Sequence, residues 1–306
     1  MPISRFPPDR GLSVRMGMTM FFLGLLYVVF VAVLAVVIKS LVVVVLIAGG
    51  LLFAQYFFSD RIALFSMGAH QVSREQAPEL HALIDRLCIM ADMPKPRVAI
   101  ADTDVPNAFA TGRNPQAAVV AVTSGIMRRL EPQELEAVLA HELSHVAHRD
   151  VAVMTIASFL GLVAGLLTRV LFYTGIYGGG FGNDDRDGNG GAPAVMVIML
   201  VSALVYVISF LLTRALSRYR ELSADRSGAL LTGAPSALAS ALTKISGDMG
   251  RIPTRDLRRA ETVNALAFAP AVSRGFSLTS IFDTHPTLQQ RLDQLARIEA
   301  DLGRSG

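Results

Sequence analysis

The stretch AHELSHVAHRD, residues 140–150, combines a metal-binding pattern with the start of an apolar run. His141 and His145 are four positions apart, so on a helix both imidazoles lie on one face, one turn apart, where they can share a metal ion. Glu142 lies beside that face, where its carboxylate can reach a metal-bound water. From Val151 onwards the chain is apolar for about the length that crosses a membrane. The sequence therefore predicts a zinc-type motif joined to a membrane span.

The composition indicates an integral membrane protein. Of the 306 residues, 52% are hydrophobic and only 17% are charged, whereas soluble proteins average about 25% charged residues. The net charge of +3 comes with arginines that flank apolar runs, where they set membrane orientation, so we do not expect nucleic-acid binding. The single cysteine, Cys88, excludes a disulfide framework and is expected to be a buried structural thiol.

Long apolar runs predict membrane-spanning helices, two of them forming a hairpin within residues 16–58. The remaining two are residues 151–172 and 194–212. The first run follows basic residues, as a signal peptide does. It is too long for a signal peptide, no small-residue cleavage site follows it, and a second span comes at once, so we expect an uncleaved anchor.

Basic residues near the spans predict the orientation. They place an N-terminal tail (residues 1–15), residues 60–150 and residues 213–306 in the cytoplasm. The Gly- and Asp-rich residues 173–193 are then an external, solvated loop, because their acid spacing does not match a calcium-binding loop. The two soluble segments form the two parts of one cytoplasmic domain.

Within residues 60–150 the pattern predicts a helix over 77–93 and strands over 97–101 and 117–123. Such strands favour a small sheet beside the metal motif, and an exposed edge strand can pair with an extended peptide. Asn107 lies between the strands, where its simplest interpretation is a turn residue. Acids and a proline from Glu131 onwards predict a helix start. This helix is expected to run without a break through the histidines into the third span.

A further metal ligand is needed downstream. A third histidine ten positions after His141 would indicate a metzincin, but that position is Val151. His148 is interpreted as a helix-surface residue. The best candidate is Glu221, which follows the fourth span by nearly the distance at which His141 precedes the third; the alternative is a salt bridge with neighbouring arginines. Asp225, one turn further on, is placed to accept a hydrogen bond from a ligand histidine.

Several motifs in this order resemble the HtpX-type membrane zinc metalloproteases, which are related to the CAAX prenyl proteases: NAFATG from Asn107, LEAVLAHELSH, ELSAD from Glu221, and DTHP from Asp283. The resemblance covers nearly the whole chain. It implies a mainly α integral membrane protein with four transmembrane helices and a cytoplasmic, gluzincin-like α+β metalloprotease domain containing a small sheet. It also implies one Zn²⁺ per chain and a role in the quality control of membrane proteins under stress, in the inner membrane.

The resemblance also assigns residues. It implies that His141, His145 and Glu221 bind zinc, that Glu142 is the general base, and that Asp225 supports a ligand. It further implies a substrate-side strand at Asn107, Ala108, Phe109 and Ala110, and an oxyanion role for His285, with Arg291 as a weaker candidate. The chain has HPTLQQR where the family pattern has a second proline and acids before the arginine, which puts the role of Arg291 in doubt.

The sequence thus predicts a zinc endopeptidase that acts on membrane-protein or peptide substrates at the lipid bilayer. One alternative is a non-catalytic membrane scaffold that holds zinc structurally, although such sites are usually closed by Cys or His. Another is a transporter, but transporters place ionisable groups inside their spans, and these spans contain almost none. The sequence leaves the substrates, the cleavage preference and the oligomeric state open.

Overall fold

The structure is a computed structural model that describes residues 10–38, scattered positions from 46 to 61, and residues 63–177, 191–249 and 286–305. The chain forms two compact units. The sheet unit comprises Met1–Leu12, Phe57–Val153 and Ser217–Gly306, and the apolar-helix unit comprises Ser13–Tyr56 and Met154–Leu216.

The sheet unit contains a small mixed sheet, with the strand order β1-β2-β4-β3. β2 (Arg97–Ala101) and β4 (Val119–Thr123) are parallel and almost coincide with the two strands predicted from the sequence. β1 (Ala69–Gln71) and β3 (Ala108–Thr111) flank them and run antiparallel to their neighbours. Val120 and Val122 on β4 are fully buried, which places the hydrophobic core against this strand.

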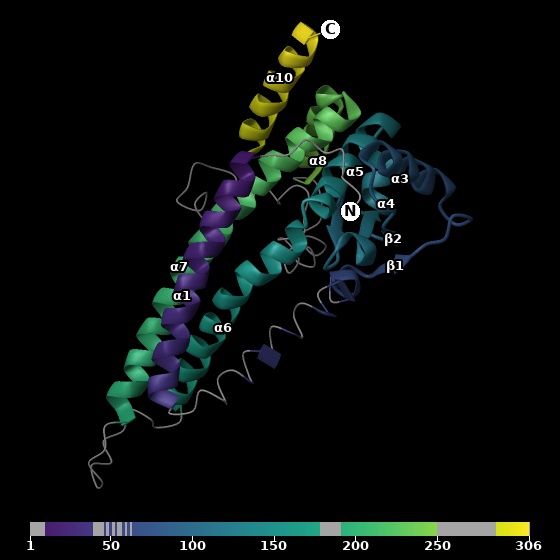
Figure 1. The fold of residues 1–306 in the computed structure, drawn as a ribbon. Helices are drawn as coiled ribbons and strands as arrows, with labels where there is room; N and C mark the ends of the chain where they lie inside the picture. Colours follow the sequence, from purple (N-terminus) through teal and green to yellow (C-terminus); the bar gives the residue numbers. More distant parts are fainter. Residues whose placement is uncertain are drawn as a thin grey trace. The chain divides into compact units, whose positions relative to one another are not determined.

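Helices build the rest of the sheet unit (Figure 1). They are α3 (Pro78–Ala91), α4 (Ser124–Arg129), α5 (Pro132–Ala147), the part of α7 (Gly191–Thr232) from Ser217 onwards, α8 (Pro235–Met249) and α10 (Leu288–Ser305), with a short 3₁₀ turn at Pro115–Ala117. α5 packs against α3, β3 and α8, and α8 packs against α10. The helix that carries the histidines is therefore the central element of the unit.

α5 begins where the sequence predicts a helix start. The side chain of Glu134 accepts a hydrogen bond from the Glu131 backbone N–H at 2.9 Å, and Glu131 accepts one in return, which forms a capping box. The Glu134 carboxylate also accepts hydrogen bonds from Ser240 (2.6 Å) and Lys244 (2.8 Å) on α8. One acid thus caps α5 and ties it to α8.

The predicted continuous helix through the histidines into the third span is wrong. α5 ends at Ala147, His148 forms its C-cap, and α6 (Asp150–Tyr177) begins after Arg149. Arg149 has a φ of 57°, the left-handed conformation that ends a helix and that non-glycine residues rarely adopt. The chain therefore turns between the metal motif and the apolar helix.

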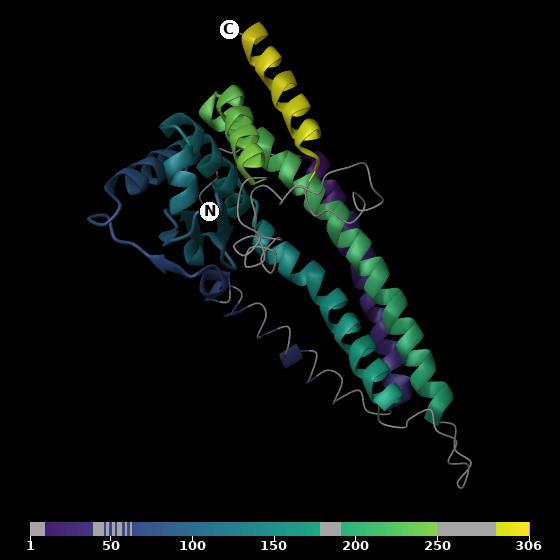
Figure 2. The same cartoon turned by 180° about the vertical axis from the view of Figure 1, so that it is seen from behind.

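The apolar-helix unit contains long helices that also appear in Figure 2. They belong to α1 (Arg10–Ile38), α6 and α7 (Gly191–Thr232). α6 and α7 are antiparallel: the Thr213 hydroxyl donates to the Ala157 carbonyl at 3.3 Å, and Gly165 lies against Tyr206 at the other end of the contact. Gly161 also lies against α7, so small residues one turn apart let the helices approach closely.

Two helical stretches in the described residues are long and apolar enough to cross a membrane, Ser13–Leu34 and Met196–Thr232, and they overlap most of the first and fourth predicted spans. The third predicted span lies in α6, whose apolar core Ala157–Arg169 is shorter. Most of the second predicted span lies outside the described residues, and so does most of the predicted loop 173–193. Large apolar side chains such as Phe21 (67% exposed) and Val28 (67%) face outwards on α1, as lipid-facing residues do.

Candidate metal centre

α5 places the motif residues in the interior of the sheet unit. His141, Glu142 and His145 are buried, with 1%, 4% and 7% of their surfaces exposed. They share the helix with fully buried apolar residues such as Leu139 and Leu143, so packing around α5 holds the polar side chains in place. Burial lowers the pKa of His145, which favours the neutral imidazole that binds metal ions.

Glu221 on α7 meets both histidines. Its Oε2 atom lies 3.6 Å from His141 Nε2 and its Oε1 atom 3.5 Å from His145 Nε2, while the two Nε2 atoms are 3.3 Å apart. Ligands bound to zinc at about 2.0–2.1 Å in tetrahedral geometry lie about 3.3 Å apart. The three side chains therefore fit one zinc ion with a fourth position left open, and the geometry favours the metal-ligand interpretation of Glu221 over a simple salt bridge.

Gly228 explains how α7 comes so close to α5. A Cβ atom at this position would lie 2.9 Å from the backbone nitrogen of His141 and 3.1 Å from its Cα, closer than side chains normally approach backbone. Gly228 follows Glu221 by two helical turns, so the close contact beside the first histidine helps to set the distance between the two helices. Only glycine fits here without displacing one of them.

The carboxylate of Asp225 lies against the ring of His141. Its Oδ1 atom lies 2.9 Å from His141 Nδ1 and it is fully buried. Arg291 on α10 donates two hydrogen bonds to the same carboxylate, from Nε at 2.7 Å and from Nη2 at 2.6 Å. The sequence had suggested Arg291 as an oxyanion-stabilising group. The structure places its guanidinium against Asp225, so that a residue of the last helix supports a metal ligand.

A second carboxylate, which sequence reasoning missed, contacts His145. Asp150 Oδ2 lies 2.7 Å from His145 Nδ1, and Arg220 Nε lies 3.1 Å from the same oxygen. Asp150 is the last residue of the stretch that contains the motif. Its carboxylate contacts His145 because the chain turns at Arg149. A positive φ at an arginine leaves no signal in the sequence.

Glu142 is held between the metal ligands and the sheet. Its Oε2 atom accepts a hydrogen bond from the Ala110 backbone N–H at 2.9 Å. Burial raises the pKa of Glu142 to about 7, although the charge of His141 and the bond from Ala110 oppose the shift. A carboxyl group with a pKa near neutrality is suited to take and return a proton at physiological pH.

β3, the strand that the family resemblance implies to be on the substrate side, lies at an edge of the sheet but is not exposed. All four of its residues, including Phe109 (3% exposed), are buried because α5 packs against it. Asn107 precedes β3 and is also buried; its backbone N–H donates to Thr123 Oγ1, and its carbonyl accepts the Thr123 N–H, both at 2.9 Å. These contacts fit the interpretation of Asn107 as a structural residue at the strand entrance.

His148 is half-buried at the end of α5 and is not a member of the metal-binding group found among the described residues. His285 lies outside the described part of the chain.

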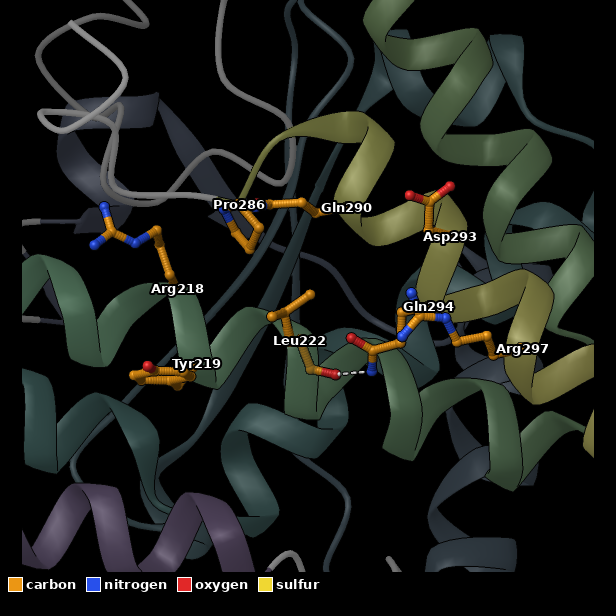
Figure 3. Close-up of a pocket in the computed structure, with 8 residues that line it drawn as sticks. All are labelled: Arg218, Tyr219, Leu222, Pro286, Gln290, Asp293, Gln294 and Arg297. Atoms are coloured by element: carbon orange, nitrogen blue, oxygen red, sulfur yellow. Dashed lines mark hydrogen bonds between the residues drawn. The ribbon is translucent and has the colours of Figure 1, made fainter. Parts of the chain in front are cut away.

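A cavity of about 520 Å³ lies on another side of α7 (Figure 3). Residues of α7 and α10 line it together with Pro286, and Gln294 donates to the Leu222 carbonyl at 2.7 Å. In Figure 3 Arg218 and Arg297 lie at opposite sides of the group of labelled residues. No metal-binding residue lines this cavity.

Comparisons with known proteins agree with this geometry. Residues 74–299 match the model of Peptidase family M48. The chain is 61% identical to Protease HtpX homolog 1 of Streptomyces coelicolor, over 99% of this chain and 97% of that one. It is 53% identical to a Protease HtpX homolog of Moorella thermoacetica, over 96% of each chain. The fold resembles the crystal structure of S. mikatae Ste24p, with a TM-score of 0.55, 17% identity, and coverage of 94% of this chain and 67% of that one.

Proposed function

Because the chain belongs to peptidase family M48 and is an HtpX-type zinc metalloprotease, we propose that it is a membrane-embedded endopeptidase that cleaves membrane proteins, including misfolded ones produced under stress. The observation that carries the proposal is the buried cluster of His141, His145 and Glu221, whose ligand atoms all lie within 4.8 Å of one another, with Glu142 beside it. Two histidines and one glutamate are a ligand set that catalytic zinc sites use.

The chain's own residues account for the proton transfers of peptide hydrolysis. Zinc bound by the cluster supplies a Lewis acid that polarises water and the scissile carbonyl. Glu142 takes the proton of the attacking water and passes it to the leaving amine. The hydrogen bond from Ala110 to Oε2 holds the carboxylate in place, so that Oε1 serves as the proton acceptor.

The substrate is expected to bind as an extended chain along Asn107–Ala110. β3 is an edge strand of the described sheet; α5 packs against it and the Ala110 N–H donates to Glu142, so a peptide would pair with its remaining backbone groups, without requiring a particular side chain. Such recognition suits an enzyme that acts on many unfolded segments. We also propose that His285 stabilises the oxyanion.

The apolar helices support a location in the bacterial inner membrane, with the sheet unit in the cytoplasm. Ser13–Leu34 and Met196–Thr232 contain the apolar windows, and α7 continues from its window into the segment that carries Glu221. A zinc ligand and an apolar helix on one continuous element would hold the site at the bilayer surface, where membrane-protein substrates are available.

The proposal is tested with the full chain purified in detergent, incubated with casein and with a destabilised membrane protein, with and without a zinc chelator. Glu142→Gln should retain one equivalent of zinc but lose cleavage by at least about 10²-fold, because the proton acceptor is gone. Glu221→Ala should lose both zinc and cleavage. The matched control is Glu136→Gln on the same helix, whose carboxylate pairs with Arg86 and not with the cluster.

Cleavage by Glu142→Gln at the wild-type rate would contradict the role of this carboxylate. A wild-type protein that binds zinc but cleaves neither substrate would instead favour the non-catalytic scaffold.

A further inference from the structure

Asp150 and Arg220 are two charged groups beside the cluster that the proposed mechanism does not use. Asp150 is 1% exposed and Arg220 is 9% exposed, and a carboxylate so deeply buried needs partners to remain charged. Its Oδ2 atom contacts His145 Nδ1 at 2.7 Å and Arg220 Nε at 3.1 Å. These contacts form a chain from arginine to carboxylate to metal-ligand histidine.

An ordinary structural role for Asp150 would be to cap α6, since it is the first residue of that helix. A capping carboxylate accepts hydrogen bonds from backbone N–H groups of the first turn. Here Oδ2 faces His145, and Oδ1 is buried without a hydrogen-bond partner in the structure as described. The carboxylate is thus directed at the histidine and not at the helix end.

We infer that Asp150 is a positioning residue for the zinc site, which fixes the ring of His145 so that Nε2 faces the metal, and that Arg220 acts through Asp150. With its Nδ1–H donated to the carboxylate, the neutral imidazole has its lone pair on Nε2, the atom that faces Glu221 at 3.5 Å. Arg220 keeps the buried carboxylate charged and aimed at the ring. Because Arg220 directly precedes Glu221 on α7, one helix supplies both a zinc ligand and the support for another.

The inference rests on the metal site of the proposed function, but it is tested by zinc affinity and not by cleavage. Zinc binding is measured by competition with a chromophoric chelator, in full-length protein carrying Glu142→Gln to prevent self-cleavage. Asp150→Ala should weaken zinc binding by about 10- to 100-fold, the usual effect of removing a group that orients a ligand. Asp150→Asn should weaken it less, by about tenfold, because its amide oxygen can still accept from Nδ1–H while the negative charge is lost.

Asparagine caps helices as well as aspartate does, so a mere capping role predicts unchanged zinc affinity in Asp150→Asn. Glu79→Gln is the matched control, since Glu79 is the acid in the first turn of α3 and lies outside the metal-binding group. It should bind zinc like the parent protein. The visible spectrum of the Co²⁺-substituted protein reports ligand geometry independently and should change in Asp150→Asn but not in Glu79→Gln.

A double-mutant cycle tests the role of Arg220. If Arg220 acts through Asp150, the double variant Arg220→Gln/Asp150→Asn should weaken zinc binding no more than Asp150→Asn alone. The double variant also leaves neither charge of this ion pair buried without its partner. Additive losses would overturn that part of the inference. Unchanged zinc affinity together with an unchanged Co²⁺ spectrum in Asp150→Asn would overturn the whole inference. A parent protein that binds no zinc would instead refute the metal site of the proposed function.

Discussion

The two ligand histidines lie one turn apart on α5, yet they are supported by different parts of the chain. Nδ1 of His141 faces Asp225 on α7, which Arg291 of the last helix holds from a position 66 residues away. Nδ1 of His145 faces Asp150, only five residues further along the chain, and Arg220 holds that carboxylate. One histidine thus depends on long-range packing, whereas the other depends on a local turn. The two ligands of one short motif are therefore positioned by carboxylates from different helices, one distant and one near in the sequence.

The largest effect is expected from Asp225→Ala, which removes the support of His141. It leaves the guanidinium of Arg291 buried without its carboxylate, and breaking a buried ion pair in this way costs about 3–5 kcal/mol. Zinc affinity should fall by about 10- to 100-fold. Thermal unfolding of the apo protein and chelator competition measure the two effects. Asp301→Ala, at an exposed ion pair with Arg304, should change neither; equal losses in both variants would contradict the specific role of Asp225.

A smaller effect is expected from Gly228→Ala, which pushes α7 away from the backbone of His141. Overpacking of this kind costs about 1–3 kcal/mol. Zinc affinity should also fall, because Glu221 and Asp225 move with α7. The control is Gly247→Ala on α8, where a Cβ atom would meet nothing within 4 Å. That substitution should stabilise the helix by about 0.5–1 kcal/mol, so the two alanines are expected to shift the unfolding temperature in opposite directions.

The smallest effect is expected from Glu134→Gln at the other end of α5. The variant weakens the capping box and loses the ion pair with Lys244, whose side chain is 40% exposed, so the cost should be about 1 kcal/mol. Zinc affinity should remain at the wild-type value, because neither histidine is supported from this end. A loss of zinc binding as large as that of Asp225→Ala would show that the supports of the histidines are not separable.

The same contrast explains how much of the site could be predicted from the sequence. His141, Glu142, His145 and Glu221 follow from helical spacing and from their positions beside apolar runs, and Asp225 follows from Glu221 by one turn. The start of α5 follows from Glu131 and Pro132, and the two central strands from their β-branched residues.

Other features have no local signal. Arginine does not favour a positive φ, so the sequence predicts that the helix continues through Arg149 and indicates no role for Asp150. The bond from Arg291 to Asp225 depends on the packing of α10, which no pattern within either segment reveals. β1, with three residues, is too short to show strand periodicity.

Because the Ala110 N–H donates to Glu142, this backbone amide can serve as a spectroscopic probe of the proposed base. In an antiparallel pair, the backbone groups of alternate residues point towards the partner strand. The carbonyl of Asn107 bonds to Thr123 on β4, so Ala110, three residues later, has its backbone groups on the opposite side. Its N–H therefore points away from β4 and donates to the Glu142 carboxylate. The chemical shift of this one amide proton therefore reports the charge on the base, and its rate of exchange with deuterium reports whether the base has left the strand. A single backbone resonance can thus follow the state of the reaction centre without any label on the substrate.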